Sequence, residues 1–207
     1  MKISKEFGGW ITSILTFILS IHYSIAGGFI FQTIIFWIPV FLGLMMFDTH
    51  LNEFKIQEII LTLIALFAAL YSIYIYIYLF IPYTLFLFSY YLKTIKFKNY
   101  MVTLTGIFGE SLMLLFSSSF SGKIVILIPF LIFIYLYGAE FGVRSFLKKN
   151  VYYSLYNFLP AAISIPLGFP IFSISILRLI YFKIKKIKII GIFETILYTI
   201  IVLFLIL

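Results

Sequence analysis

The chain has 207 residues, of which 64% are hydrophobic, 21% aromatic and 11% charged, with a formal net charge of +8. Its mean hydropathy is +1.18. About a quarter of the residues of a soluble domain are charged, so this chain has too few charges to cover a water-exposed surface. We expect an all-α, polytopic membrane protein with the lipid bilayer as its main partner and no nucleic acid partner. The sequence contains no cysteine, which excludes disulfides, thiolate nucleophiles and cysteine metal sites.

Apolar runs follow one another along the whole chain, and a membrane-spanning helix needs about 17–25 such residues. The first 27 residues resemble a signal peptide, but the rest is equally apolar, so we expect a first membrane helix there. Charges and Gly/Pro breaks predict one transmembrane helical domain over 1–207, with nine segments (eight is the alternative): 9–25, 28–47, 57–74, 76–93, 101–119, 123–143, 151–166, 168–183 and 188–206. The seventh and eighth segments are short and meet at IPLGFP, so they form two spans or a re-entrant pair.

The distribution of basic residues orients these segments. With the N-terminus in the cytoplasm, fourteen of the fifteen Lys and Arg residues fall at cytoplasmic ends, and Lys123 lies outside. Cytoplasmic loops carry an excess of Lys and Arg, so this asymmetry favours an odd number of segments and a multi-pass cell-membrane protein. The same rule explains the net charge of +8, so binding to nucleic acid is not needed to account for it.

Some of the ionisable residues lie within the predicted segments or near their ends, and charged groups at membrane depth are costly and usually functional or paired. Glu110 lies roughly 14 Å into the fifth segment and Glu194 roughly 9 Å into the ninth, at 1.5 Å per residue. Arg178 lies near the end of the eighth segment. Glu140 and Arg144 are four residues apart near the end of the sixth and share a helix face.

Three interpretations of these groups stay open. Glu194 pairs with Arg178 or a nearby lysine and holds helices together. Alternatively, Glu110, Glu140, Arg144, Arg178 and Glu194 converge on one cytoplasm-facing pocket, where the arginines hold the anionic head of an amphipathic or lipid-like ligand. Buried carboxylates also occur in proton or ion passage. The catalytic residues, if there are any, are unknown.

The two ends of the chain resemble YwiC-like integral membrane proteins. KEFGGW, from Lys5 to Trp10, is similar to the KEHGAW that opens that family, with Phe7 in place of its histidine. LRLIYFKIKKIKIIGIFE is similar to the family's ending, which places Arg178, Gly191 and Glu194 on family positions. The resemblance implies a relative of similar length and layout, and no particular activity.

The helical layout is also similar to UbiA-type prenyltransferases, which hold Mg²⁺ and a prenyl diphosphate with two aspartate-rich loops. The first such place here offers Asp48 and Glu53 as weak metal candidates, because hard cations need several oxygen ligands. The second offers Glu140 and Arg144, without paired aspartates. We therefore expect no cofactor, with Mg²⁺ required only if the chain is such an enzyme.

Three function classes follow from these features. The first, which we favour, is a YwiC-like membrane protein that is non-enzymatic or of uncertain activity, with a cytoplasm-facing polar pocket for an amphipathic or lipid-like ligand. The second is a UbiA-like enzyme acting on an isoprenoid substrate. The third is a small transporter or an accessory subunit of a membrane complex. The sequence does not determine the oligomeric state.

Overall fold

A computed structural model describes residues 7–46, 56–95, 99–119, 126–184 and 186–207. All regular elements of these residues are helices, which confirms the all-α prediction for this part of the chain. The chain divides into two compact units, Met1–Val125 and Ile126–Leu207, each with its own packed interior. The single domain predicted over 1–207 stays a prediction.

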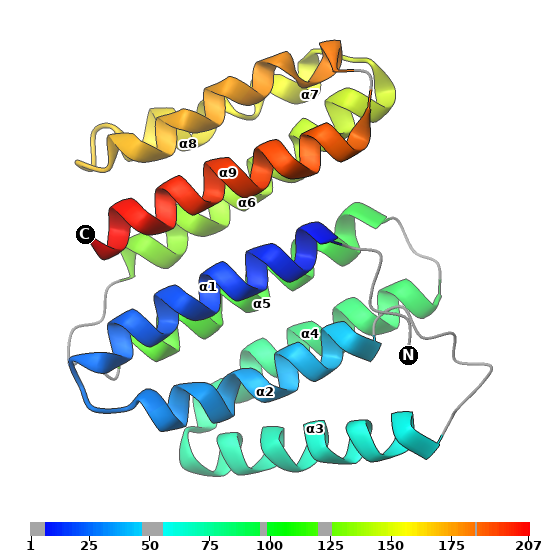
Figure 1. The fold of residues 1–207 in the computed structure, drawn as a ribbon, viewed down its shortest axis with the longest axis vertical. Helices are drawn as coiled ribbons and strands as arrows, with labels where there is room; N and C mark the ends of the chain where they lie inside the picture. Colours follow the sequence, from blue (N-terminus) through cyan, green and yellow to red (C-terminus); the bar gives the residue numbers. More distant parts are fainter. Residues whose placement is uncertain (1–6, 47–55, 96–98, 120–125, 185) are drawn as a thin grey trace. The chain divides into compact units, whose positions relative to one another are not determined.

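The first unit closely follows the predicted segments, and Figure 1 shows α1 lying along α5 and α2 lying beside α3. Gly28, with a φ of +74°, forms the turn between the first two helices, a backbone conformation that suits glycine. The helices are α1 (Phe7–Ile25), α2 (Ile30–Met46), α3 (Ile56–Ile75), the 3₁₀ helix η1 (Ile77–Leu79), α4 (Phe80–Thr94) and α5 (Asn99–Ser119).

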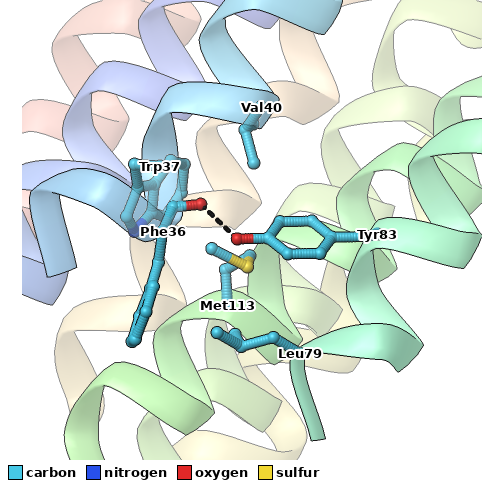
Figure 2. Packing of buried hydrophobic residues seen from close by; sticks show 6 residues of the cluster. All are labelled: Phe36, Trp37, Val40, Leu79, Tyr83 and Met113. Atoms are coloured by element: carbon cyan, nitrogen blue, oxygen red, sulfur yellow. Dashed lines mark hydrogen bonds between the residues drawn. The ribbon is translucent and has the colours of Figure 1, made fainter. Parts of the chain in front are cut away.

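The interior of the first unit is an apolar cluster contributed by four of its elements (Figure 2). Its buried members are Phe36, Trp37, Val40, Leu79, Tyr83 and Met113. The Tyr83 hydroxyl donates to the carbonyl oxygen of Phe36 at 2.7 Å. Pro39 lies inside α2 and has no backbone N–H, so the carbonyl one turn before it loses its usual donor. The bond from Tyr83 of α4 reaches the neighbouring carbonyl and supports the helix at this point.

The second unit contains α6 (Leu127–Lys148), α7 (Tyr152–Leu155), α8 (Phe158–Ser164), the 3₁₀ helix η2 (Pro170–Lys183) and α9 (Ile187–Ile206). Lys149 ends α6 in the left-handed conformation, with a φ of 49°. Segment 151–166 forms two short helices where we expected one. Asn157 lies between these two helices. Its backbone carbonyl accepts a hydrogen bond from the Ser175 hydroxyl of η2 at 2.7 Å, which ties this break in the helix to η2.

Three of the described helices are long and apolar enough to cross a membrane: Met101–Ser119, Leu127–Lys148 and Ile187–Ile206. Other apolar helices in the described ranges are shorter. Large apolar side chains are exposed on both units; Phe31 is 78% exposed in the first and Leu147 62% in the second. Apolar surface on this scale requires apolar surroundings, which fits association with a membrane.

Candidate functional site

One row of side chains on η2 is fully buried and repeats every three residues. Its members are Phe172, Ser175, Arg178 and Tyr181, each with 0% exposure. In a 3₁₀ helix, residues i and i+3 lie directly above one another, so a period of three gives a straight row. A run of 14 residues is long for this type of helix. This row faces the interior of the second unit and contains a fully buried charged residue, Arg178.

Arg178 is bound on several sides within this interior. Its Nε and Nη2 donate to the two carboxylate oxygens of Glu194 at 2.7 and 2.8 Å. Its Nη1 donates to the Tyr135 carbonyl oxygen at 3.0 Å and to Asn157 Oδ1 at 3.3 Å. The guanidinium has five N–H donors, and four hydrogen bonds are made. The pairing with Glu194 that the sequence suggested is confirmed.

Two tyrosines complete the surroundings of the pair. The guanidinium carbon of Arg178 lies 3.9 Å from the centre of the Tyr135 ring, a cation–π contact. The Tyr181 hydroxyl donates to Glu194 Oε1 at 2.7 Å. The Arg178 side chain is fully buried, whereas that of Glu194 is 19% exposed. Burying a charge is costly unless it is paired and hydrogen-bonded, and this set of partners meets both conditions.

Two glycines of α6 allow this arrangement. A Cβ at Gly138 would lie 3.0 Å from Asn157 Oδ1 and 3.4 Å from Arg178 Nη1. A Cβ at Gly142 would lie 3.2 Å from the Tyr181 ring. Small residues four apart let helices approach closely in membrane proteins. The spacing of the glycines in GAEFG is the signal in the sequence for this contact, which we did not predict.

Glu140 and Arg144 form a separate pair on α6. Arg144 Nε donates to Glu140 Oε1 at 3.2 Å, and both side chains are partly exposed. At 3.6 residues per turn, Glu140 is about 200° around the helix from Gly138, so it lies on the face opposite the one that packs on η2. The Glu140–Arg144 pair therefore lies on a different side of α6 from the Arg178–Glu194 pair, which belongs to η2 and α9.

Glu110 belongs to the first unit. It is 5% exposed, and the Ser13 hydroxyl of α1 donates to its Oε1. Arg178, Glu194, Glu140 and Arg144 all belong to the second unit. Convergence of all five residues on one pocket stays a prediction.

The described residues contain no group of three or more His, Cys, Asp and Glu side chains able to hold a metal ion. Asp48 and Glu53, the weak metal candidates, lie outside the described residues. The Mg²⁺ expected for a prenyltransferase-like enzyme stays a prediction.

A shallow apolar groove runs along η2, with a volume of about 430 Å³. The residues of η2 that line it form two rows of the 3₁₀ helix, and neither is the buried row of Arg178. One row is Pro170, Ser173 and Ile176, the other is Ile171, Ile174 and Leu177, and Phe204 of α9 completes the lining. This groove was not predictable from the sequence, because nothing in the sequence distinguishes a 3₁₀ helix from an α-helix here.

The chain matches no protein-family model, no curated protein sequence and no solved structure. What can be said of its function therefore rests on its own residues and their geometry.

Proposed function

We propose that the chain is a polytopic integral membrane protein that binds an amphipathic, lipid-like ligand, with the hydrocarbon chain of the ligand lying in the groove along η2. The groove is the observation that carries this proposal. Its volume of about 430 Å³ is within the range of about 300–1,000 Å³ usual for ligand pockets, which are mostly apolar with few polar groups. The lining residues fit that description, with Ser173 as the polar side chain.

The 3₁₀ geometry of η2 explains why an extended chain fits. Side chains at i and i+3 lie above one another, so the furrow between two rows runs parallel to the helix axis. Pro170 to Leu177 extends roughly 14 Å at about 2.0 Å per residue. An α-helix has inclined ridges in place of straight rows. A straight furrow of this length suits an extended acyl or prenyl chain.

The buried arginine has a structural role in this proposal. Four hydrogen bonds already engage the guanidinium of Arg178, and its side chain is fully buried. An anionic head group would have to displace the carboxylate of Glu194. We therefore propose that Arg178 and Glu194 hold η2 against α9 and α6, and that the head group of the ligand does not bind to this pair.

The membrane topology and family are also part of the proposal. We propose nine segments with a cytoplasmic N-terminus, on the distribution of Lys and Arg. We further propose kinship with YwiC-like membrane proteins. Two of the residues that carry the resemblance, Arg178 and Glu194, are the residues that pair.

The test fills the groove and counts bound lipid. The wild-type chain and Ile174→Trp are reconstituted in vesicles of equal phosphatidylcholine and phosphatidylglycerol, extracted in mild detergent, and compared by native mass spectrometry. Because the indole would occupy the furrow, we expect Ile174→Trp to lose the most tightly held lipid. Ile196→Trp is the matched control, since Ile196 is 51% exposed on α9 and does not line the groove.

Two results would overturn the proposal. Wild-type protein that retains no lipid under conditions where it stays folded has no such site. Equal loss of lipid from Ile174→Trp and Ile196→Trp would place the retained lipid elsewhere on the surface.

A further inference from the structure

One face of α1 carries a row of buried hydroxyls against α5. Ser13, Thr16, Ser20 and Ser24 are all fully buried, and their spacings of three, four and four residues place them on one side of an α-helix. Figure 1 shows α1 and α5 side by side within the first unit. Three of these hydroxyls donate to carbonyls of their own helix, whereas Ser13 donates across the interface to Glu110.

Glu110 is the acidic member of this interface. Its Oε1 accepts the hydrogen bond from Ser13, and its Oε2 is buried without a hydrogen-bond partner among the described residues. It lies roughly 14 Å from Met101 along α5, at 1.5 Å per residue. This depth places the carboxyl group well inside Met101–Ser119, one of the three helices able to cross a membrane.

No described charged side chain from a neighbouring helix lies beside Glu110. The elements packed most extensively on α5 are α1, α4 and η1. Residues of α2, which meets Met113 of α5 in the apolar cluster, include no Asp, Glu, Lys, Arg or His. On α1, His22 is nine residues from Ser13, roughly 14 Å along the axis. On α4, Ser89 donates to the carbonyl of Val102, eight residues before Glu110. The hydroxyl of Tyr83, also on α4, donates to Phe36.

We propose that Glu110 is a reversible proton-binding site in the interface of α1 and α5. An isolated carboxylate in an apolar interior is far more costly than a neutral carboxylic acid with one unmade hydrogen bond. The carboxylate takes a proton from hydronium at Oε2, which leaves water and a neutral acid, and the reverse step returns the carboxylate. Ser13 keeps its bond to Oε1 and orients the group. This site is in the first unit and does not depend on the lipid proposal.

The first test is difference infrared spectroscopy of the full chain in phosphatidylcholine vesicles, between acidic and alkaline buffer. We expect a protonated-carboxyl carbonyl band that appears and disappears reversibly and shifts in D₂O. Glu110→Gln is isosteric and should abolish the band. Ser13→Ala should keep the band and change its frequency, because the hydrogen bond at the carboxyl group is lost. A purely structural carboxyl group would give no reversible band.

The second test needs no substitution and therefore survives a variant that fails to fold. A hydrophobic carbodiimide reacts with protonated carboxyl groups inside membranes, and peptide mass spectrometry locates the adduct. We expect the adduct at Glu110 and none at Glu194, whose carboxylate is bound by Arg178 and Tyr181. Equal modification of the two glutamates, no adduct at Glu110, or a carboxyl band that never changes with pH would overturn the proposal.

Discussion

Arg178 of η2 and Glu194 of α9 are joined by two hydrogen bonds, Nε to Oε1 at 2.7 Å and Nη2 to Oε2 at 2.8 Å. This is the bidentate geometry in which guanidinium and carboxylate match best. The pair also reaches Tyr135 and Asn157 through Nη1. It thereby connects η2 and α9 with α6 and with the segment between α7 and α8.

Breaking this pair should strongly destabilise the second unit. Glu194→Ala would leave Arg178 as a buried charge without its counter-ion, for which we expect a loss of about 3–5 kcal/mol in the free energy of unfolding. Arg178→Lys should also destabilise, because an ammonium cannot make the bidentate contact. The measurement is denaturant unfolding of detergent-solubilised protein.

The control for that prediction is Glu140→Ala. Glu140 and Arg144 form a partly exposed pair within α6, and such pairs contribute about 0–1 kcal/mol. Similar losses for Glu140→Ala and Glu194→Ala would contradict the structural role of Arg178.

Adding a methyl group at Gly142 should force α6 away from η2. The Cβ of Gly142→Ala would lie 3.2 Å from the Tyr181 ring, which is fully buried and bonded to Glu194. Overpacking of this kind costs about 1–3 kcal/mol. The midpoint of thermal unfolding in detergent should fall.

Gly191→Ala is the matched control on α9, because a Cβ there meets nothing within 4 Å. Alanine is favoured over glycine inside a helix by about 0.5–1 kcal/mol. We expect the midpoint of Gly191→Ala to stay the same or rise. A decrease as large as that of Gly142→Ala would show that the contact with Tyr181 is not what matters.

Two tyrosines should respond differently to loss of the hydroxyl. The Tyr83 hydroxyl donates to the carbonyl of Phe36 near Pro39 (Figure 2), so Tyr83→Phe should lose about 1 kcal/mol of stability. The Tyr135 hydroxyl is buried and has no hydrogen-bond partner in the described part of the chain, so Tyr135→Phe should be neutral or stabilising. Denaturant unfolding of both variants decides this, and the reverse order would contradict the hydrogen bonding described.

The proposed topology can be tested with single cysteines, since the natural chain contains none. With nine segments and a cytoplasmic N-terminus, Lys149→Cys lies on the cytoplasmic side and Leu167→Cys on the outer side. Both residues are exposed at ends of helices in the second unit. An impermeant maleimide added to intact cells should label Leu167→Cys, and label Lys149→Cys only after the cells are opened. If the stretch from α7 to η2 were re-entrant instead, the maleimide would label neither cysteine in intact cells.

The sequence by itself determined the limits of most helices to within a few residues, because those limits are local; the exceptions are α6 and the segment 151–166, which forms two short helices. Charges, Gly and Pro interrupt the apolar runs, and the predicted segment 188–206 corresponds closely to α9. It also indicated the partner of Glu194, since a charge at membrane depth needs a counter-ion and Arg178 was the nearest candidate.

Only the tertiary structure decided which groups surround that pair and what η2 is. Tyr135 and Asn157 lie 43 and 21 residues from Arg178, and Ser13 lies 97 residues from Glu110. Contacts at such separations depend on how helices pack. The three-residue period of η2, with Arg178 in the buried row and the groove between the other two, arises from the same packing, because no local signal in the sequence favours 3₁₀ over α geometry.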